Sequence, residues 1–123
     1  MENKKRFSGI WGEIYSARFL RDKGLTILSA NYRTRNGEVD LIAQDNTYIV
    51  FVEVKARGKG AIAEPKEAVG YTKQKKLTAA ALEFLSVNPY GLNSRFDVIE
   101  VFLGEEYKLE KINHIENAFD ATI

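Results

Sequence analysis

The chain has 123 residues, of which 45% are hydrophobic and 28% charged, an ordinary balance for one globular domain, which we place at residues 1–123. It has no cysteine, and His114 is its single histidine, so disulfides, a zinc site of Cys and His ligands and a histidine-based nuclease are excluded. No apolar run is long enough to span a bilayer, and the first residues lack the apolar core of a signal peptide. We therefore expect a cytoplasmic location and no contact with a membrane.

The formal net charge of +1 hides an uneven distribution of charge along the chain. Residues 1–35 and residues 55–76 each carry a net charge of +5, whereas the residues from Asp97 onward carry −5. Two basic segments can form one basic surface that binds a polyanion such as nucleic acid. Solvated charge without any partner explains the same distribution equally well.

Residues 8–24 have the pattern of a helix, with Ser8 as the expected N-cap and Gly24 as the C-terminal stop. Glu13 is the exception on its apolar face, because it is a carboxylate one turn into the helix. It is either a partly exposed residue at the edge of that face or an acidic group directed at a site formed later in the chain. The predicted buried face consists of Ile10, Glu13, Ile14, Ala17 and Leu20.

Three strands are expected next, at residues 25–33, 38–43 and 48–54, with the first at or near a sheet edge. An Arg-Asn-Gly turn at residues 35–37 joins the first strand to the second, and a tight turn at Asp45-Asn46 joins the second to the third. The third strand is almost wholly apolar, which is typical of a buried central strand.

Charged residues at the end of this buried strand predict a chemical site, because unpaired burial of a charge is costly. With the turn at Asp45-Asn46, paired positions sum to 91, so Asp40 lies opposite Phe51 and diagonal to Glu53. Asp40, Glu53 and Lys55 then point to one face of the sheet. Two carboxylates at this spacing can share a divalent cation such as Mg²⁺, which prefers carboxylate oxygens. We expect a one-residue shift of the turn to place Asp40 on the opposite face.

After Lys55 the sequence continues as a basic loop rich in Gly and Ala, which includes Lys59 and is suited to gripping a phosphate backbone. Arg57, at the end of the strand, is a candidate phosphate clamp because of its planar guanidinium group. A solvated or ion-paired strand end is an equally good interpretation of Arg57.

A second helix is expected from Thr72, its N-cap, to about Val87, after a short first turn that opens at Pro65. One turn before its apolar stripe, Lys73 and Gln74 lean over the sheet. Lys75 and Lys76 are interpreted as the solvated basic start of an ordinary amphipathic helix. The predicted buried stripe consists of Leu77, Ala80, Ala81, Phe84 and Leu85.

Two more strands, at residues 95–103 and 107–115, follow the second helix, and residues 116–123 are expected to form one loose turn. The predicted order is helix, three strands, helix, two strands. This order indicates an α/β (α+β mixed) domain with a central mixed sheet of about five strands flanked by helices.

Five short segments of the sequence form a recognisable set: GE at 12–13, GEVDLIA at 37–43, FVEVKAR at 51–57, KQ at 73–74 and RFDV at 95–98. Together they resemble the YraN-like family of uncharacterised bacterial proteins, which are endonuclease-like and similar to archaeal Holliday-junction resolvases. Asp40 followed by Glu53-Val54-Lys55 also resembles the signature of the PD-(D/E)xK nuclease superfamily, although Val39 stands where that signature has proline.

The resemblance implies a restriction-endonuclease-like fold and a metal site. In that superfamily the counterparts of Asp40 and Glu53 hold Mg²⁺, helped by the backbone carbonyl of the residue at Val54, and Mn²⁺ is a substitute. The counterpart of Lys55 orients or activates the attacking water, and that of Glu13 completes the acidic site. Gln74 lies where related nucleases carry a helix residue near the site.

The first hypothesis is therefore a Mg²⁺-dependent nuclease that acts on DNA, branched or damaged DNA included. The second is a non-catalytic module that keeps the fold and binds nucleic acid or recruits a partner, and a metal-binding structural domain is a third. A structural ion pair is the alternative interpretation of Glu53 and Lys55. Analogy to junction resolvases suggests a homodimer, since two symmetric cuts need two sites.

Overall fold

The computed structural model describes residues 4–58 and 69–121 as a single five-stranded sheet with a helix on each side. The element order matches the one expected from the sequence, and the mixed sheet with flanking helices fits a restriction-endonuclease-like fold. In chain order the elements are α1 (Lys4–Asp22), β1 (Thr26–Arg33), β2 (Glu38–Gln44), β3 (Tyr48–Arg57), α2 (Tyr71–Val87), β4 (Asn93–Leu103), the short 3₁₀ helix η2 (Glu105–Tyr107) and β5 (Leu109–Phe119).

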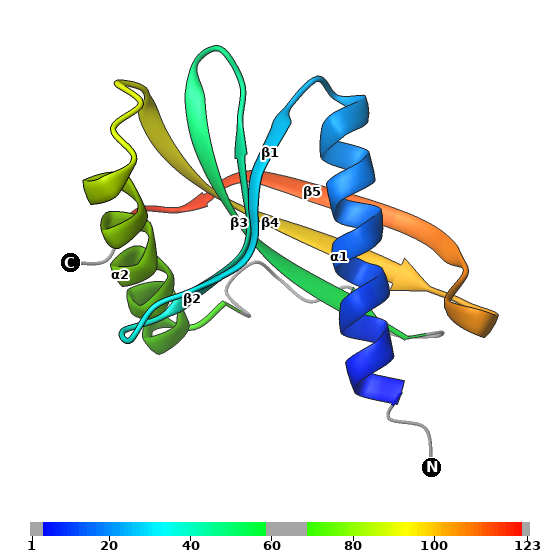
Figure 1. The fold of residues 1–123 in the computed structure, drawn as a ribbon. Coiled ribbons are helices and arrows are strands. Elements are labelled where there is room, and N and C mark those ends of the chain that lie inside the picture. The colour runs from blue at the N-terminus through cyan, green and yellow to red at the C-terminus, as the bar shows by residue number, and fades with distance from the viewer. Residues whose placement is uncertain (1–3, 59–68, 122–123) are drawn as a thin grey trace.

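The spatial order of the strands is β1-β2-β3-β4-β5, so β3 is central and β1 lies at an edge, as expected. Neighbouring strands are antiparallel except for β3 and β4, which are parallel. A parallel pair needs a crossover connection, and the segment that contains α2 provides it. Figure 1 shows the two helices on opposite sides of the strongly twisted sheet. Within the described residues, no helix is both long and apolar enough to cross a membrane.

Each helix covers one face of the sheet and closes its own apolar core. On one face, Leu77 and Phe84 of α2 pack with Phe51 of β3 and Val98 of β4. On the other face, Leu20 of α1 packs with residues of β2, β3 and β4, and aromatic side chains of α1 lie beside it. Burial on both faces explains why β3 is an almost continuous apolar run.

The start and the buried face of α1 differ from the prediction. The helix begins at Lys4, so Ser8 is not its N-cap, whereas Gly24 does end it, with a φ of +96° that favours glycine. Ile10 is 44% exposed, although it was expected on the buried face. The helix instead packs through Gly12, Ser16 and Leu20, because small residues let its backbone approach the sheet closely.

The second helix ends at Val87 as expected, but Gly70 rather than Thr72 is its N-cap. Leu77, Ala80, Ala81 and Phe84 are buried as predicted, together with Thr78. The first turn expected at Pro65 lies outside the described residues.

The turn between β2 and β3 lies one residue further on than predicted. The pairs run from Leu41–Val52 to Gln44–Ile49, so paired positions sum to 93 and not to 91. The Asp45 carboxylate accepts hydrogen bonds from the backbone N–H groups of Thr47 and Tyr48, which fixes the turn at Asn46 and Thr47. A shift of the turn by one residue moves the register of β2 against β3 by two residues. Ile42 rather than Asp40 therefore lies opposite Phe51. The side chains of the paired residues do not change to the other face of the sheet, contrary to what was expected for a one-residue shift.

The last strand is longer than predicted. β5 continues to Phe119, so residues 116–119 are part of the sheet and not of a loose turn. A bulge accompanies this extension, because the register with β4 shifts between Phe96 and Val98 and Asn117 has a φ of +50°.

Candidate active site

The candidate active site lies where β2 separates from β3. Their pairing ends at Leu41–Val52, while β2 stays paired with β1 as far as Arg33–Glu38. Figure 1 shows the β1–β2 hairpin running toward α2 and away from β3. At this fork the Asp40 carboxylate accepts a hydrogen bond of 2.8 Å from the backbone N–H of Val54. A side chain of β2 therefore replaces the backbone partner that the N–H of Val54 has lost.

Glu53 is the most buried carboxyl group of the fork, with only 4% of the residue exposed. Burial, a hydrogen bond with Asp40 and the charge of Asp40 raise its pKa from the ordinary 4.5 to about 8, against the opposing effect of two lysines. Those are Lys55, whose Nζ lies 3.6 Å from Glu53 Oε2, and Lys73, at 3.5 Å. Asp40, Glu53 and Lys55 are thus brought together as predicted.

The second helix contributes Lys73 to the fork, whereas Gln74 holds the entry to the helix. Lys73 Nζ lies 3.8 Å from Glu38 Oε1 as well as close to Glu53, so it connects α2 with both β2 and β3. The Gln74 amide donates a hydrogen bond of 2.7 Å to the backbone carbonyl of Val69. The predicted contact of Gln74 with nucleic acid stays a prediction.

Glu13 approaches the fork from α1, on the opposite side of the sheet from α2. A Cβ on Gly12 would lie 3.2 Å from the Cβ of Ala56, so glycine there lets the helix lie close to β3. Burial and the charge of Asp40 raise the pKa of Glu13, while a hydrogen bond from Asn31 opposes them. The 2.8 Å bond from the Asn31 amide holds Glu13 Oε1.

The three carboxyl groups are neighbours, but they do not form a closed ligand set. In the described part of the chain, only one trio of acidic or histidine side chains brings its ligand atoms within 4.8 Å of one another, and it is not Glu13, Asp40 and Glu53. That trio is Asp97, His114 and Glu116. The predicted metal ligation by Glu13, Asp40, Glu53 and the carbonyl of Val54 stays a prediction.

Arg57 is held by an acidic partner at the end of β3. Its guanidinium lies 3.4 Å from the buried carboxylate of Glu100, and only 15% of the Arg57 side chain is exposed. Asn113 donates to the other oxygen of Glu100 at 2.9 Å. This arrangement agrees with the interpretation of Arg57 as an ion-paired residue at the end of the strand. The predicted contact of Arg57 with phosphate stays a prediction. Lys59 lies outside the described residues.

Two residues of the fork were missed by the sequence reasoning. Glu38 pairs with Arg33 at 3.3 Å and with Lys73, and the GE dipeptide before Asp40 was the available signal. Asn31 has a φ of +53° in the middle of β1, and asparagine is both disfavoured in strands and tolerant of positive φ. An asparagine inside a predicted strand could therefore have indicated a special position.

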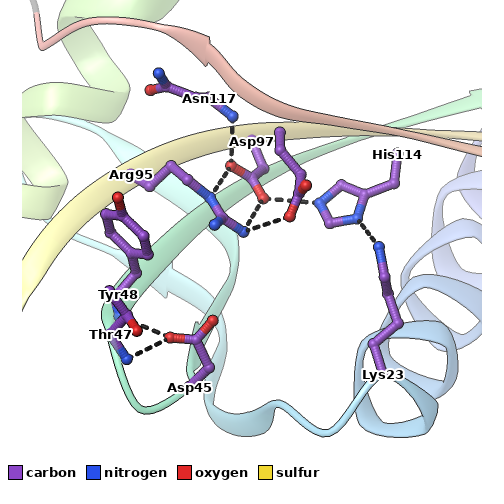
Figure 2. A network of polar contacts seen from close by, with 9 residues as sticks. Lys23, Asp45, Thr47, Tyr48, Arg95, Asp97, His114 and Asn117 are labelled. Carbon is purple, nitrogen blue, oxygen red and sulfur yellow. Dashed lines mark hydrogen bonds and ion pairs between the residues drawn. The ribbon is translucent and has the colours of Figure 1, made fainter.

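A second polar network lies on β4 and β5 and is fully neutralised. Asp97, which is completely buried, accepts two hydrogen bonds from Arg95 at 2.8 and 2.9 Å and one from the backbone N–H of Asn117. Its Oδ2 also lies 2.7 Å from His114 Nε2, and His114 Nδ1 lies 3.0 Å from Lys23 Nζ (Figure 2). Because lysine can only donate, Nδ1 accepts and Nε2 donates to Asp97.

In the Asp97 network the guanidinium group of Arg95 neutralises Asp97 and Glu116, as a metal ion would in a metal site. Arg95 lies 3.2 Å from Glu116 and also stacks over the ring of Tyr48 at 5.0 Å. Burial would raise the pKa of Asp97, but hydrogen bonds from His114, Arg95 and Asn117 outweigh it and hold the pKa below its ordinary value. We therefore interpret this network as structural.

The chain is similar throughout its length to bacterial proteins of one family. The profile described as "Uncharacterised protein family UPF0102" matches residues 12–101. A UPF0102 protein of Alkaliphilus oremlandii is 51% identical over 120 residues, which cover 95% of this chain and 99% of the relative. UPF0102 proteins of Caldanaerobacter subterraneus (44% identical) and Lachnoclostridium phytofermentans (43% identical) each cover 95% of this chain, and 97% and 96% of their own lengths are matched.

Proposed function

The chain belongs to the UPF0102 family, the YraN-like family whose motifs it carries, and on this premise we propose that it is a nuclease. The proposed reaction is metal-dependent hydrolysis of phosphodiester bonds in DNA, branched or damaged DNA included. One observation carries the proposal: Asp40 and Glu53 are hydrogen-bonded carboxyl groups at the fork, with Lys55 and Lys73 beside them.

The donor set fits a hard divalent cation, Mg²⁺ or Mn²⁺. Asp40 and Glu53 would hold it through carboxylate oxygens, with Glu13 and the carbonyl of Val54 as further oxygen donors. The raised pKa of Glu53 supports this assignment, because two carboxylates this close favour sharing a proton unless a cation favours their ionised forms. When bound, the metal supplies charge stabilisation at the phosphate and lowers the pKa of a coordinated water.

The lysines of the fork supply the remaining groups that the reaction needs. Lys55 is 28% exposed at its side chain, so its ammonium group can reach a bound phosphate while it stays close to Glu53. It would donate a hydrogen bond to the scissile phosphate or orient the attacking water. Lys73 adds a second positive charge from α2 and would bind the same substrate.

The first prediction tests this reaction. The purified protein is incubated with Mg²⁺ or Mn²⁺ and single-stranded, duplex, flap and four-way-junction DNA, and cleavage is followed on denaturing gels. We expect cleavage of at least one form, and a loss of more than 100-fold in Asp40→Ala and Glu53→Ala, because each removes a ligand of the proposed cation. Asp120→Asn changes an exposed acid and is the control that should keep full activity. Cleavage that survives both fork substitutions would disprove the assignment.

The second candidate function is a non-catalytic module that binds nucleic acid or recruits a partner. The observation that favours it is that the ammonium groups of Lys55 and Lys73 already lie 3.6 and 3.5 Å from Glu53, so positive side chains occupy the fork. Such a module would bind DNA with a steep salt dependence and would cut none of the four DNA forms. A homodimer stays an expectation from the analogy to junction resolvases.

A further inference from the structure

A basic groove lies between the β1–β2 turn and the first turns of α2. Its volume is about 330 Å³, and its charged lining consists of Arg33, Arg35, Lys73 and Lys76 against the single acid Glu38. The groove therefore carries a net charge of +3 from these side chains. Figure 1 shows the β1–β2 hairpin reaching α2 at this point. Neither Arg35 nor Lys76 was assigned a function from the sequence.

The turn that forms one wall of the groove is held in place by several hydrogen bonds. The Thr34 hydroxyl accepts from the backbone N–H groups of Asn36 and Gly37, both at 3.1 Å. The Asn36 amide donates to Glu83 on α2 at 2.9 Å. A Cβ on Gly37 would lie 1.9 Å from the backbone carbonyl oxygen of Lys76, so only glycine allows this close approach. The shape of the groove thus exists before any ligand binds.

The cations of the groove divide into two kinds. Arg33 and Lys73 are paired with Glu38, at 3.3 and 3.8 Å. The side chains of Arg35 and Lys76 are exposed, and they have no hydrogen-bond or ion-pair partner among the described residues. Two unpaired cations that face one preformed groove are suited to a bound anion, since the guanidinium fork and the ammonium group both donate to phosphate oxygens.

The groove is directly connected to the fork. The Nζ of Lys73 lies 3.8 Å from Glu38, which lines the groove, and 3.5 Å from Glu53 of the candidate active site. A polymer with one negative charge per nucleotide could therefore place one phosphate at the fork and another in the groove. A lone small anion would gain nothing from the second position.

We infer that the groove between the β1–β2 turn and α2 binds a backbone phosphate of nucleic acid, next to the phosphate that is cut, through Arg35 and Lys76. This inference deepens the proposed function, because it names a second contact with the same substrate. Its ligand is an internal phosphodiester and not a terminal or free phosphate.

Adjacent lysines on α2 offer a matched test. Lys76 lines the groove. The neighbouring Lys75 is also exposed, but it lies over the ring of Tyr71 at 5.7 Å and does not line the groove. Binding of a fluorescent DNA 20-mer is measured by anisotropy at several salt concentrations with Ca²⁺, a hard cation that takes oxygen ligands. We expect Arg35→Ala and Lys76→Ala each to weaken binding about fivefold to tenfold near 0.1 M salt and to reduce the salt slope by about one. Lys75→Ala should bind like the wild type, and circular dichroism checks that all variants fold.

The outcomes separate this inference from the proposed function. If no DNA form is cut but Arg35→Ala and Lys76→Ala weaken binding selectively, the groove assignment holds and the nuclease assignment fails. If the wild type cuts DNA while these variants bind and cut like Lys75→Ala, the groove assignment is wrong. Binding that requires a 5′-phosphate on the 20-mer, or that millimolar inorganic phosphate displaces, also overturns it, since either would show a terminal or free phosphate as the ligand.

Discussion

At the scale of single residues, Glu53 determines the chemistry that the fork can perform. It is almost fully buried, and its neighbours act in opposite directions on its charge. Burial and Asp40 favour the protonated form, while Lys55 and Lys73 favour the carboxylate. The outcome is a carboxyl group whose pKa of about 8 keeps it largely protonated at neutral pH in the absence of a cation. Such a buried carboxyl group beside a second one lowers the stability of the fold, so stability alone does not explain its position.

The raised pKa predicts how the stability of the metal-free protein depends on pH. Between the ordinary pKa of 4.5 and the folded value of about 8, the folded state binds more protons than the unfolded state, so stability falls as pH rises through this window. Glu53→Gln keeps the size but removes the charge. We expect it to be more stable than the wild type by about 4–5 kcal/mol at pH 8.5 in EDTA, and to lose this advantage near pH 4.5.

Urea denaturation at a series of pH values measures this difference. Asp22→Asn, a change of an exposed acid at the end of α1, is the control substitution. An advantage of Glu53→Gln that is the same at pH 4.5 and pH 8.5 would contradict the assigned pKa shift.

At the scale of secondary-structure elements, two glycines set the positions of the helices on the sheet. Gly12 brings α1 close to the end of β3, and Gly37 brings the β1–β2 turn against the backbone of α2. Both precede a glutamate of the candidate site, Glu13 and Glu38. The Gly-Glu dipeptides are thus explained by contacts between elements, which a strand or helix pattern alone does not contain.

Gly37→Ala should therefore disturb the contact between the β1–β2 turn and α2. A Cβ so close to the Lys76 carbonyl forces the turn away from the helix, and we expect a loss of about 1–3 kcal/mol in unfolding free energy. Gly9→Ala is the opposite case, since nothing lies within 4 Å of its Cβ inside α1, and it should stabilise the protein by about 0.5–1 kcal/mol. Thermal or urea unfolding measures both, and equal effects of the two substitutions would contradict the close-contact explanation.

The sequence predicts the elements better than the contacts between them. The order of elements and the central position of β3 follow from apolar periodicity, which is a local property. The register of the β2–β3 hairpin could not be fixed in this way, because the Asp45 side chain and not the residue pattern selects the turn. Asp40 nevertheless lies beside Glu53 and is hydrogen-bonded to it, since the register differs from the predicted one by only two residues.

The limits of sequence reasoning at the site have the same origin. Asp40, Glu53 and Lys55 share one hairpin, so the local pairing of two strands is enough to bring them together. The position of Glu13 depends on the packing of α1 through Gly12, and the pairing of Arg57 with Glu100 depends on the parallel neighbour β4. Such contacts join residues far apart in the chain, and a single sequence does not reveal them.

At the scale of the whole molecule, the sheet carries two polar centres of different character. The fork has neighbouring carboxyl groups and two partly exposed lysines, and its charge balance changes when Glu53 ionises. The Asp97 network binds its own cation, Arg95, and connects β4, β5 and the end of α1 (Figure 2). The charge of the fork can therefore respond to a bound ligand. The charges of the Asp97 network are already paired with one another, and this pairing stabilises the fold.

The Asp97 network should accordingly support the stability of the whole domain at neutral pH. Asp97→Asn leaves Arg95 buried without its main partner, and we expect a loss of about 3 kcal/mol in unfolding free energy at pH 7. Because the folded pKa of Asp97 is depressed, the stabilisation is present above its unfolded pKa, near 3.9, and is lost as pH falls through the lower folded value. The difference between the wild type and Asp97→Asn should therefore shrink below about pH 4. Glu116→Gln, which changes an exposed partner of Arg95, should cost less than about 1 kcal/mol. Urea denaturation from pH 3 to pH 7 measures these differences, and a gap that stays constant over that range would show that the ionised carboxylate is not what stabilises the sheet.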